Sequence, residues 1–246
     1  MNIFHTILYQ PLFNLLIALY NVIPGQDIGF AIIVLTVLVK LALWPLSQSS
    51  LKSQKALQEI QPKLEALKVE FGDDKEKLAK AMMDLYAAEK VSPFSSCLPL
   101  LIQLPILIAL YSVLSAGLHP ESLDQLYAFI PNPGTINTMF LGIVDLTARN
   151  IPLAILAGIF QFFQTKMLIA RRPPKSVRST PGAKDEDMLA SMNQSMMYFM
   201  PVMTTIIGFS LPGGLTLYWV ATNAISILQQ KLAFSKKKED KTSEKV

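Results

Sequence analysis

One charged residue, Lys40, lies inside a stretch from Gly29 to Leu46 that is otherwise apolar apart from Thr36. In a helix, which rises about 1.5 Å per residue, Lys40 lies roughly 16 Å from Gly29 and roughly 9 Å from Leu46. An ammonium at that depth in a bilayer costs about 2.5–3.5 kcal/mol on insertion scales. Two explanations are open from this stretch alone: the side chain reaches the lipid headgroups, or a polar cavity receives it.

Other polar side chains interrupt later apolar stretches, and they favour the cavity. Polar groups in membrane helices usually face one another or water, although each one alone is explained by a hydrogen bond between helices. Together with Lys40 they predict a hydrated pocket with one positive charge. The candidate pocket-lining residues are Lys40, Gln103, Gln161, Gln164, Trp219 and Asn223, and Thr216, Ser226 and Gln230 are further polar residues of the last stretch.

The composition predicts which elements must position these residues. Of 246 residues, 51% are hydrophobic and 16% are charged, and the mean hydropathy is +0.38, whereas a soluble domain usually has about 25% charged residues. The single cysteine, Cys97, excludes an internal disulfide, and the two histidines are too few for a metal site. We therefore expect an all-α polytopic membrane protein without a cofactor, with five transmembrane helices at 28–48, 98–118, 152–169, 195–211 and 214–228.

The segments outside these spans are also expected to be helical or loop-like. Residues 1–27 predict an amphipathic helix in the external membrane interface, with a crossing helix as the alternative. Residues 49–93 predict a helical hairpin, because an apolar stripe runs to Phe71, Gly72 interrupts it, and Asp73 with Glu76 resembles a capping box. Residues 139–150 are expected to form a peripheral segment, and residues 171–184 a basic loop. Both lie within the four-span region 94–232, and residues 233–246 after it are expected to form a disordered basic tail.

The distribution of Lys and Arg predicts the orientation. All but two of the 22 basic residues lie in the hairpin, in the segment 166–184, and from Lys231 into the tail; the exceptions are Lys40 and Arg149. Basic residues concentrate in cytoplasmic segments of membrane proteins. The amino terminus is therefore expected outside and the carboxyl terminus in the cytoplasm, as five spans require.

Several motifs, in order along nearly the whole chain, resemble those of the YidC/Oxa/Alb family of membrane protein insertases. They are CLPLLIQLPI at 97–106, MMYFMP at 196–201, LPGGLTLYW at 211–219, and Asn223 followed by Gln229 and Gln230. The large extracytoplasmic domain of some members and a lipoprotein-type amino terminus are absent from the sequence. Family members most often have arginine where this chain has Lys40, and lysine lacks the planar fork for bidentate carboxylate pairing.

The resemblance implies a non-enzymatic insertase of the bacterial plasma membrane. Its groove, open to the cytoplasm and the lipid, would receive nascent membrane proteins, with a Sec-type translocon and the ribosome as candidate partners and no specific nucleic acid sequence. A methionine stripe at Met192, Met196, Met200 and Met203 suits varied apolar substrates, although ordinary packing explains it too. The alternatives are a small transporter or channel with a solute site at Lys40, although no inverted repeat is visible, and a chaperone that only helps helices pack.

Overall fold

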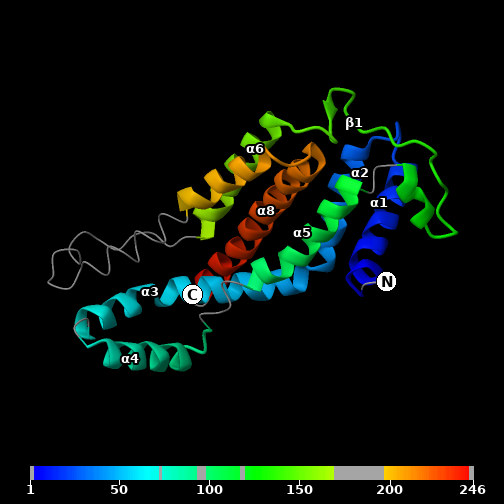
Figure 1. Ribbon diagram of the computed structural model, residues 1–246. Coiled ribbons are helices and arrows are strands. Elements are labelled where there is room, and N and C mark those ends of the chain that lie inside the picture. The colour runs from blue at the N-terminus through cyan, green and yellow to red at the C-terminus, as the bar shows by residue number, and fades with distance from the viewer. Residues whose placement is uncertain (1–2, 72–73, 93–97, 117–119, 169–196, 244–246) are drawn as a thin grey trace.

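The computed structural model describes residues 3–71, 74–92, 98–116, 120–168 and 197–243. The described residues are mostly helical, as the sequence predicted (Figure 1). The helices are a π-helical turn His5–Tyr9, α1 Gln10–Val22, α2 Ile28–Ala42, α3 Trp44–Phe71, α4 Lys75–Ala88, α5 Leu98–Ala116, α6 Ile151–Leu168, a helix Met197–Gly208, and α8 Gly213–Ser243. Between α5 and α6 lie a 3-10 helix, Pro120–Gln125, and the two short strands β1 Met139–Phe140 and β2 Val144–Asp145.

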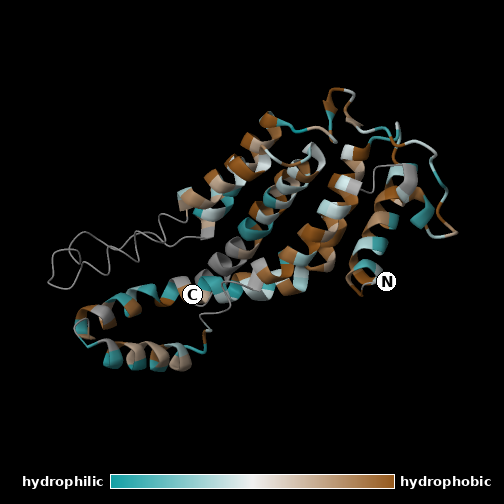
Figure 2. Ribbon diagram, in the orientation of Figure 1, coloured by the Kyte–Doolittle hydropathy of each residue, from teal (hydrophilic) through white to brown (hydrophobic). Residues whose placement is uncertain are grey.

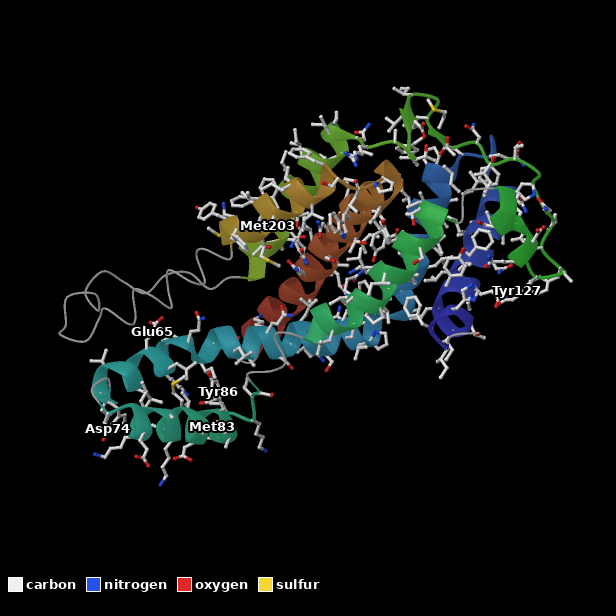
Figure 3. All side chains as sticks on the ribbon, viewed as in Figure 1. Glu65, Asp74, Met83, Tyr86, Tyr127 and Met203 are labelled. Carbon is white, nitrogen blue, oxygen red and sulfur yellow. The ribbon has the colours of Figure 1, made fainter. Side chains whose placement is uncertain are left out.

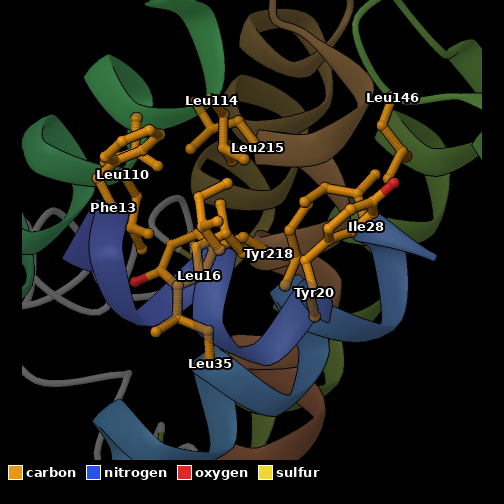
Figure 4. Packing of buried hydrophobic residues seen from close by; sticks show 14 of the residues in the cluster. Phe13, Leu16, Tyr20, Ile28, Leu35, Leu110, Leu114, Leu146, Leu215 and Tyr218 are labelled. Carbon is orange, nitrogen blue, oxygen red and sulfur yellow. The ribbon is translucent and has the colours of Figure 1, made fainter. Parts of the chain in front are cut away.

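Helix α8 is central to the bundle, because α6, α2 and α5 all pack against it. Helix α1 packs on α2 and α5 on the other side, so one apolar core joins four helices and the segment before α6 (Figure 4). The helix Met197–Gly208 lies beside α6 (Figure 1), where a Cβ on Gly208 would come within 2.9 Å of Ala154. The core residues shown include Phe13, Leu16, Tyr20, Ile28, Leu35, Leu110, Leu114, Leu146, Leu215 and Tyr218.

The first predicted span contains a break. Helix α2 ends at Ala42, and α3 starts at Trp44 in a direction that differs by 67°. Pro45 accounts for the break, because proline has no backbone N–H and disfavours helical geometry in the residue before it. Residues 44–48, which the sequence assigned to the span, thus belong to the helix that continues into the hairpin.

Helices α3 and α4 form the hairpin, which projects away from the bundle (Figure 1). Lys63 and Glu89 form an ion pair between its two helices. The cap of α4 is Asp74, at the far tip in Figure 3, and not Asp73, which lies outside the described residues. Asp74 accepts the backbone N–H of Lys77 at 3.1 Å. Hydrogen bonds from the Lys77 side chain and backbone lower the pKa of the Asp74 carboxyl.

Helix α1 carries a polar stripe that binds another part of the chain. Asn14 is 1% exposed, and its amide donates to the carbonyl oxygens of Gln10 at 2.8 Å and Gln125 at 3.3 Å. Its Oδ1 accepts the backbone N–H of Tyr127 at 2.6 Å. The polar face of this helix, which suggested a position in the membrane interface, therefore also forms hydrogen bonds to the segment that follows α5.

Residues 120–149, which we call the loop cover, lie over the end of the bundle where α2 and α8 begin (Figure 1). The side chain of Asp27 caps α2 through Gly29 N and Phe30 N, and its Oδ2 accepts Leu141 N at 2.7 Å. Gly213 N and Gly214 N donate to Ala148 O and Leu146 O, both at 2.8 Å. The segment 139–150, expected only to be peripheral, is thus a β-hairpin bonded to the first turns of two helices.

The tail differs from the expected disorder, because α8 continues as a helix to Ser243. Residues 229–243 contain neither glycine nor proline and are rich in lysine and other residues that tolerate a helix. The charged end of the chain therefore extends the last helix of the bundle.

Within the described ranges, no single helix is both long and apolar enough to cross a membrane by itself, whereas the bent pair of α2 and α3 meets that test jointly. Shorter apolar helices cover Leu101–Ser115, Ile151–Met167 and Met197–Gly208. Figure 2 shows apolar residues on outward faces of these bundle helices, while the hairpin is largely hydrophilic. The exposed large apolar residues include Phe30, Val34, Leu38, Leu101, Leu104, Ile108, Ile155, Ile159, Phe163, Phe199, Val202 and Ile206.

Candidate functional site

Lys40 points into the bundle from the last turn of α2. Its Nζ donates a hydrogen bond to Ser226 Oγ on α8 at 3.1 Å, and the lysine side chain is only half-buried. The Ser226 hydroxyl in turn donates to the carbonyl oxygen of Thr222 at 2.8 Å, so its oxygen remains oriented as an acceptor for the ammonium. The structure therefore places the charge beside a polar group of another helix.

Ser226 belongs to a buried polar face of α8, in which Thr222, Asn223, Gln229 and Gln230 lie three or four positions from Ser226 and Thr216 lies two turns before Asn223. This spacing puts side chains on one side of a helix. Its polar members are almost fully enclosed, between 0% and 8% exposed. We call this set the α8 polar face: Thr216, Thr222, Asn223, Ser226, Gln229 and Gln230.

Asn223 connects the α8 polar face to α6. Its amide donates to the carbonyl oxygen of Ala157 at 3.4 Å. Gln161 and Gln164 follow Ala157 by four and seven residues, so they share its face of α6, and both are half-buried. The structure therefore gathers Gln161 and Gln164 on the side of α6 that packs against α8.

Gln103 and Trp219 occupy different surroundings. The Gln103 amide donates to the hydroxyl of Tyr218, which joins α5 to α8. Trp219 is half-buried and packs against the apolar core. Of the six candidates, Asn223 is a member of the α8 polar face and Lys40 donates to another member, Ser226. Gln103 has no hydrogen bond to that face in the described residues; it donates to Tyr218, elsewhere on α8.

Sequence reasoning did not find Tyr218, and it named Ser226 only as a polar residue. Tyr218 lies within a run of apolar residues, and nothing in its spacing distinguishes it from a core aromatic. Ser226 is one helical turn from Asn223, and that spacing was the available signal. Met192, Met196 and Cys97 lie outside the described residues, while Met200 is 37% exposed and Met203 is half-buried.

The described residues contain no group of three or more His, Cys, Asp or Glu side chains that could hold a metal ion. What the candidate site offers instead is one ammonium, several amides and several hydroxyls. These groups can attract a carboxylate and can exchange hydrogen bonds with a polar chain.

Comparison with known proteins gives a family. The family model described as 60Kd inner membrane protein matches residues 15–241. A membrane protein insertase YidC of Legionella pneumophila (strain Corby) is 35% identical over 237 residues, which cover 96% of this chain and 37% of the relative. The proteins of that name from Nitrosococcus oceani and Shewanella halifaxensis are 37% and 36% identical over 227 residues, covering 92% of this chain and 36% of each relative. The chain thus spans little more than a third of the length of these relatives.

Proposed function

We propose a function from one premise: this chain belongs to the family described as 60Kd inner membrane protein, which includes the YidC membrane protein insertases. The protein inserts nascent membrane proteins into a bacterial plasma membrane and helps them fold there. It acts without covalent catalysis. Lys40, Gln103, Gln161, Gln164, Trp219 and Asn223 line the path that the substrate takes.

The membrane arrangement belongs to the same proposal. Five spans, the first formed by α2 and the first residues of α3 (28–48, bent at Leu43) and the others at 98–118, 152–169, 195–211 and 214–228, place the amino terminus outside and the rest of the hairpin, to residue 93, and the tail 233–246 in the cytoplasm. The exposed apolar side chains on α2, α5, α6 and the helix Met197–Gly208 support lipid contact, since soluble monomers rarely expose apolar patches of that extent. The distribution of lysine and arginine supports the orientation.

The observation that carries the proposal is the position of the Lys40 ammonium. It donates to Ser226 on the buried α8 polar face, while residues of α2 around it, such as Leu38 and Leu41, are exposed and apolar. A single positive charge beside a buried polar face and bordered by a lipid-type surface matches what an acidic membrane-protein tail needs. Each charged or unpaired polar group that crosses hydrocarbon is costly, and a polar, positively charged path shortens that crossing.

In the proposed mechanism, a carboxylate of the substrate tail replaces Ser226 as the partner of Lys40. A hydrogen bond between charged groups is stronger than one to a hydroxyl, so the exchange favours the bound tail. The apolar helix of the substrate then moves sideways into lipid, because its own apolar surface is buried there. The hairpin and the tail contact the substrate, a Sec-type translocon or the ribosome on the cytoplasmic side.

The test uses the purified protein in liposomes with a single-span substrate whose translocated tail carries two aspartates. We expect the protein to raise the fraction of tails protected from external protease. Lys40→Leu should lower the insertion rate by about tenfold or more, because a charge-assisted hydrogen bond contributes roughly 1.5–3 kcal/mol. Lys40→Arg should retain most of the rate, since it keeps the charge. Equal rates for Lys40→Leu and the unchanged protein would contradict the proposed role of Lys40.

The transporter alternative makes a different prediction in the same liposomes, namely solute uptake that depends on Lys40 without any insertion. A chaperone that acts only after insertion would leave the tails unprotected when no other machinery is present. No contact in the described residues favours either one over the insertase.

A further inference from the structure

Two buried side-chain amides, at the carboxyl-terminal end of the α8 polar face, each have one atom without a hydrogen-bond partner in the described residues. Gln229 is 4% exposed and Gln230 is 2% exposed. Within the described part of the chain, Nε2 of Gln229 has no acceptor and Oε1 of Gln230 has no donor. One unpaired donor and one unpaired acceptor thus lie on adjacent residues.

This arrangement is costly unless another state of the protein uses these atoms. A buried polar group without a partner destabilises a protein by about 1–3 kcal/mol, and most buried polar groups are paired. Methionine has nearly the same length as glutamine and would fill the same space without that cost. The pair therefore indicates a function that requires both groups.

The two free atoms need a partner that both donates and accepts. A carboxylate can use the donor of Gln229 but not the acceptor of Gln230, and an ammonium can use only the acceptor. The backbone of each non-proline residue in a substrate segment carries one C=O and one N–H, so it can use both. We propose that Gln229 and Gln230 form a subsite for the backbone of a substrate segment during its insertion, which rests on the proposed insertase function.

The subsite lies next to the contact between Lys40 and Ser226. Ser226, the partner of Lys40, precedes Gln229 and Gln230 by three and four residues, so about one helical turn, or roughly 5 Å, separates them along α8. A carboxylate bound at Lys40 would bring the backbone of its neighbouring residues to the two amides. Lys40 thus recognises charge, while the amides recognise a group that every residue of a substrate carries.

Helix α3 is the part of the structure that can uncover this subsite. It packs against α5 and against α8, whose carboxyl-terminal half meets α3 in Figure 1, and its Ser50 and Leu51 are buried. The break at Leu43 separates α3 from α2. Displacement of α3 can therefore expose the end of the α8 polar face while α2 keeps Lys40 in place.

The test compares Gln229→Met, Gln230→Met and the double variant with a matched control, Leu228→Met, whose side chain is 59% exposed on another face of the same turn. Each protein is reconstituted in liposomes with two single-span substrates, one with two aspartates in its tail and one with none. We expect each single glutamine variant to lower the insertion of both substrates by about fivefold, the effect of losing one hydrogen bond. The control should insert both substrates like the unchanged protein.

Thermal unfolding separates this role from a structural one. Because the two atoms are unpaired, the methionine variants should unfold at the same temperature as the unchanged protein or at a higher one. A lower unfolding temperature together with slower insertion would mean that the amides only support the fold, and would overturn the proposal. Wild-type insertion of both substrates by the double variant would overturn it as well, and would leave water as the only partner of the amides.

Cross-linking supplies a second measurement that does not depend on the methionine variants. A photoreactive residue at 233, which lies on the same face of α8 three and four residues after the two glutamines, should cross-link to a substrate stalled on the ribosome, and one at 228 should not. Absence of the cross-link at 233 in a protein that inserts both substrates would overturn the backbone subsite alone. Absence of insertion by the unchanged protein would contradict the proposed function itself.

Discussion

The loop cover and the α8 polar face are both rich in polar side chains, but their hydrogen bonding differs. Next to the loop cover, Asp27 accepts three backbone N–H groups, one of them from the cover, and Asn14 makes three hydrogen bonds to the backbone, two of them to the cover. On the α8 polar face, Lys40 has a single hydroxyl partner, and the amides of Gln229 and Gln230 keep unpaired atoms. One region uses its polar groups to close the bundle, while the other leaves atoms of Gln229 and Gln230 available, although Asn223 and Ser226 also bond to backbone carbonyls.

The difference has a physical basis in what each polar group binds. Backbone groups are obligatory partners that stay with the protein, so a side chain bonded to them is fixed by the fold. A side chain bonded to a hydroxyl, or to nothing, can exchange that contact for a ligand at little cost. Polar composition alone therefore does not mark a binding region, whereas incomplete pairing does.

The largest expected effect is a difference in water access. In a chain with Cys97→Ser, a cysteine at Gln164 should react with a water-soluble maleimide on the order of a hundredfold faster than a cysteine at Leu146, a residue of the loop cover that is 0% exposed. Reaction at a sealed site needs local opening that costs several kcal/mol. Labelling rates in membrane vesicles measure this ratio. Equal rates at the two positions would remove the distinction between a closed and an available region.

Asn14→Leu should strongly destabilise the bundle. The substitution removes three hydrogen bonds and leaves buried backbone groups of the loop cover without partners, which we expect to cost about 3 kcal/mol. Thermal unfolding in detergent measures the change. Asn223→Leu is the comparison on the α8 polar face, where one long bond of 3.4 Å is lost. A larger loss for Asn223→Leu than for Asn14→Leu would reverse the comparison.

Asp27→Ala should have a smaller effect, about 2 kcal/mol, because the lost helix cap and the bond to Leu141 N lie partly in solvent. Asp27→Asn keeps one acceptor oxygen and is the matched control, with a smaller loss expected. Unfolding measurements on both variants test this order. Unchanged stability of Asp27→Ala would show that the loop cover is held by its apolar contacts instead.

The smallest expected effect concerns the hairpin, which belongs to neither region. The hydrogen bonds from Lys77 lower the pKa of Asp74 from its usual value near 3.8. A lowered pKa in the folded state means that Asp74 stabilises α4 above pH 3.8 and loses this contribution as the pH falls through the lower value. Circular dichroism should show a slight loss of hairpin helicity in that acidic range. The variant Asp74→Asn should lack this pH dependence, and an identical titration would contradict it.

The sequence predicted the helices better than their ends and contacts. Apolar runs placed α5 and α6 within a few residues, because burial or lipid contact requires such runs whatever the neighbours are. The end of α2 at Ala42 was missed, although Pro45 was a visible signal. The β-hairpin of the loop cover could not be predicted, because its strands have two residues each and depend on Asp27, more than a hundred residues earlier in the chain.

For the candidate site, the sequence likewise predicted some of the residues but not the contacts between them. Lys40 and Asn223 stand out because their side chains are unusual in apolar helices. That Lys40 meets Ser226, and that Gln103 meets Tyr218, depends on how α2 and α5 pack against α8. Whether an atom of Gln229 or Gln230 has a partner is a property of all its neighbours together, so no pattern along the chain reports it.

The break between Ala42 and Trp44 also makes the hairpin a lever. With 28 residues, α3 is about 42 Å long, so a rotation of roughly 10° at the break displaces its far end by about 7 Å. Lys40 is only three residues from the pivot and hardly moves in such a rotation. A pull or push at the tip, near Asp74, is therefore converted into a small motion at the base of α3. Large movements of the hairpin tip can thus be accommodated while the ammonium keeps its place.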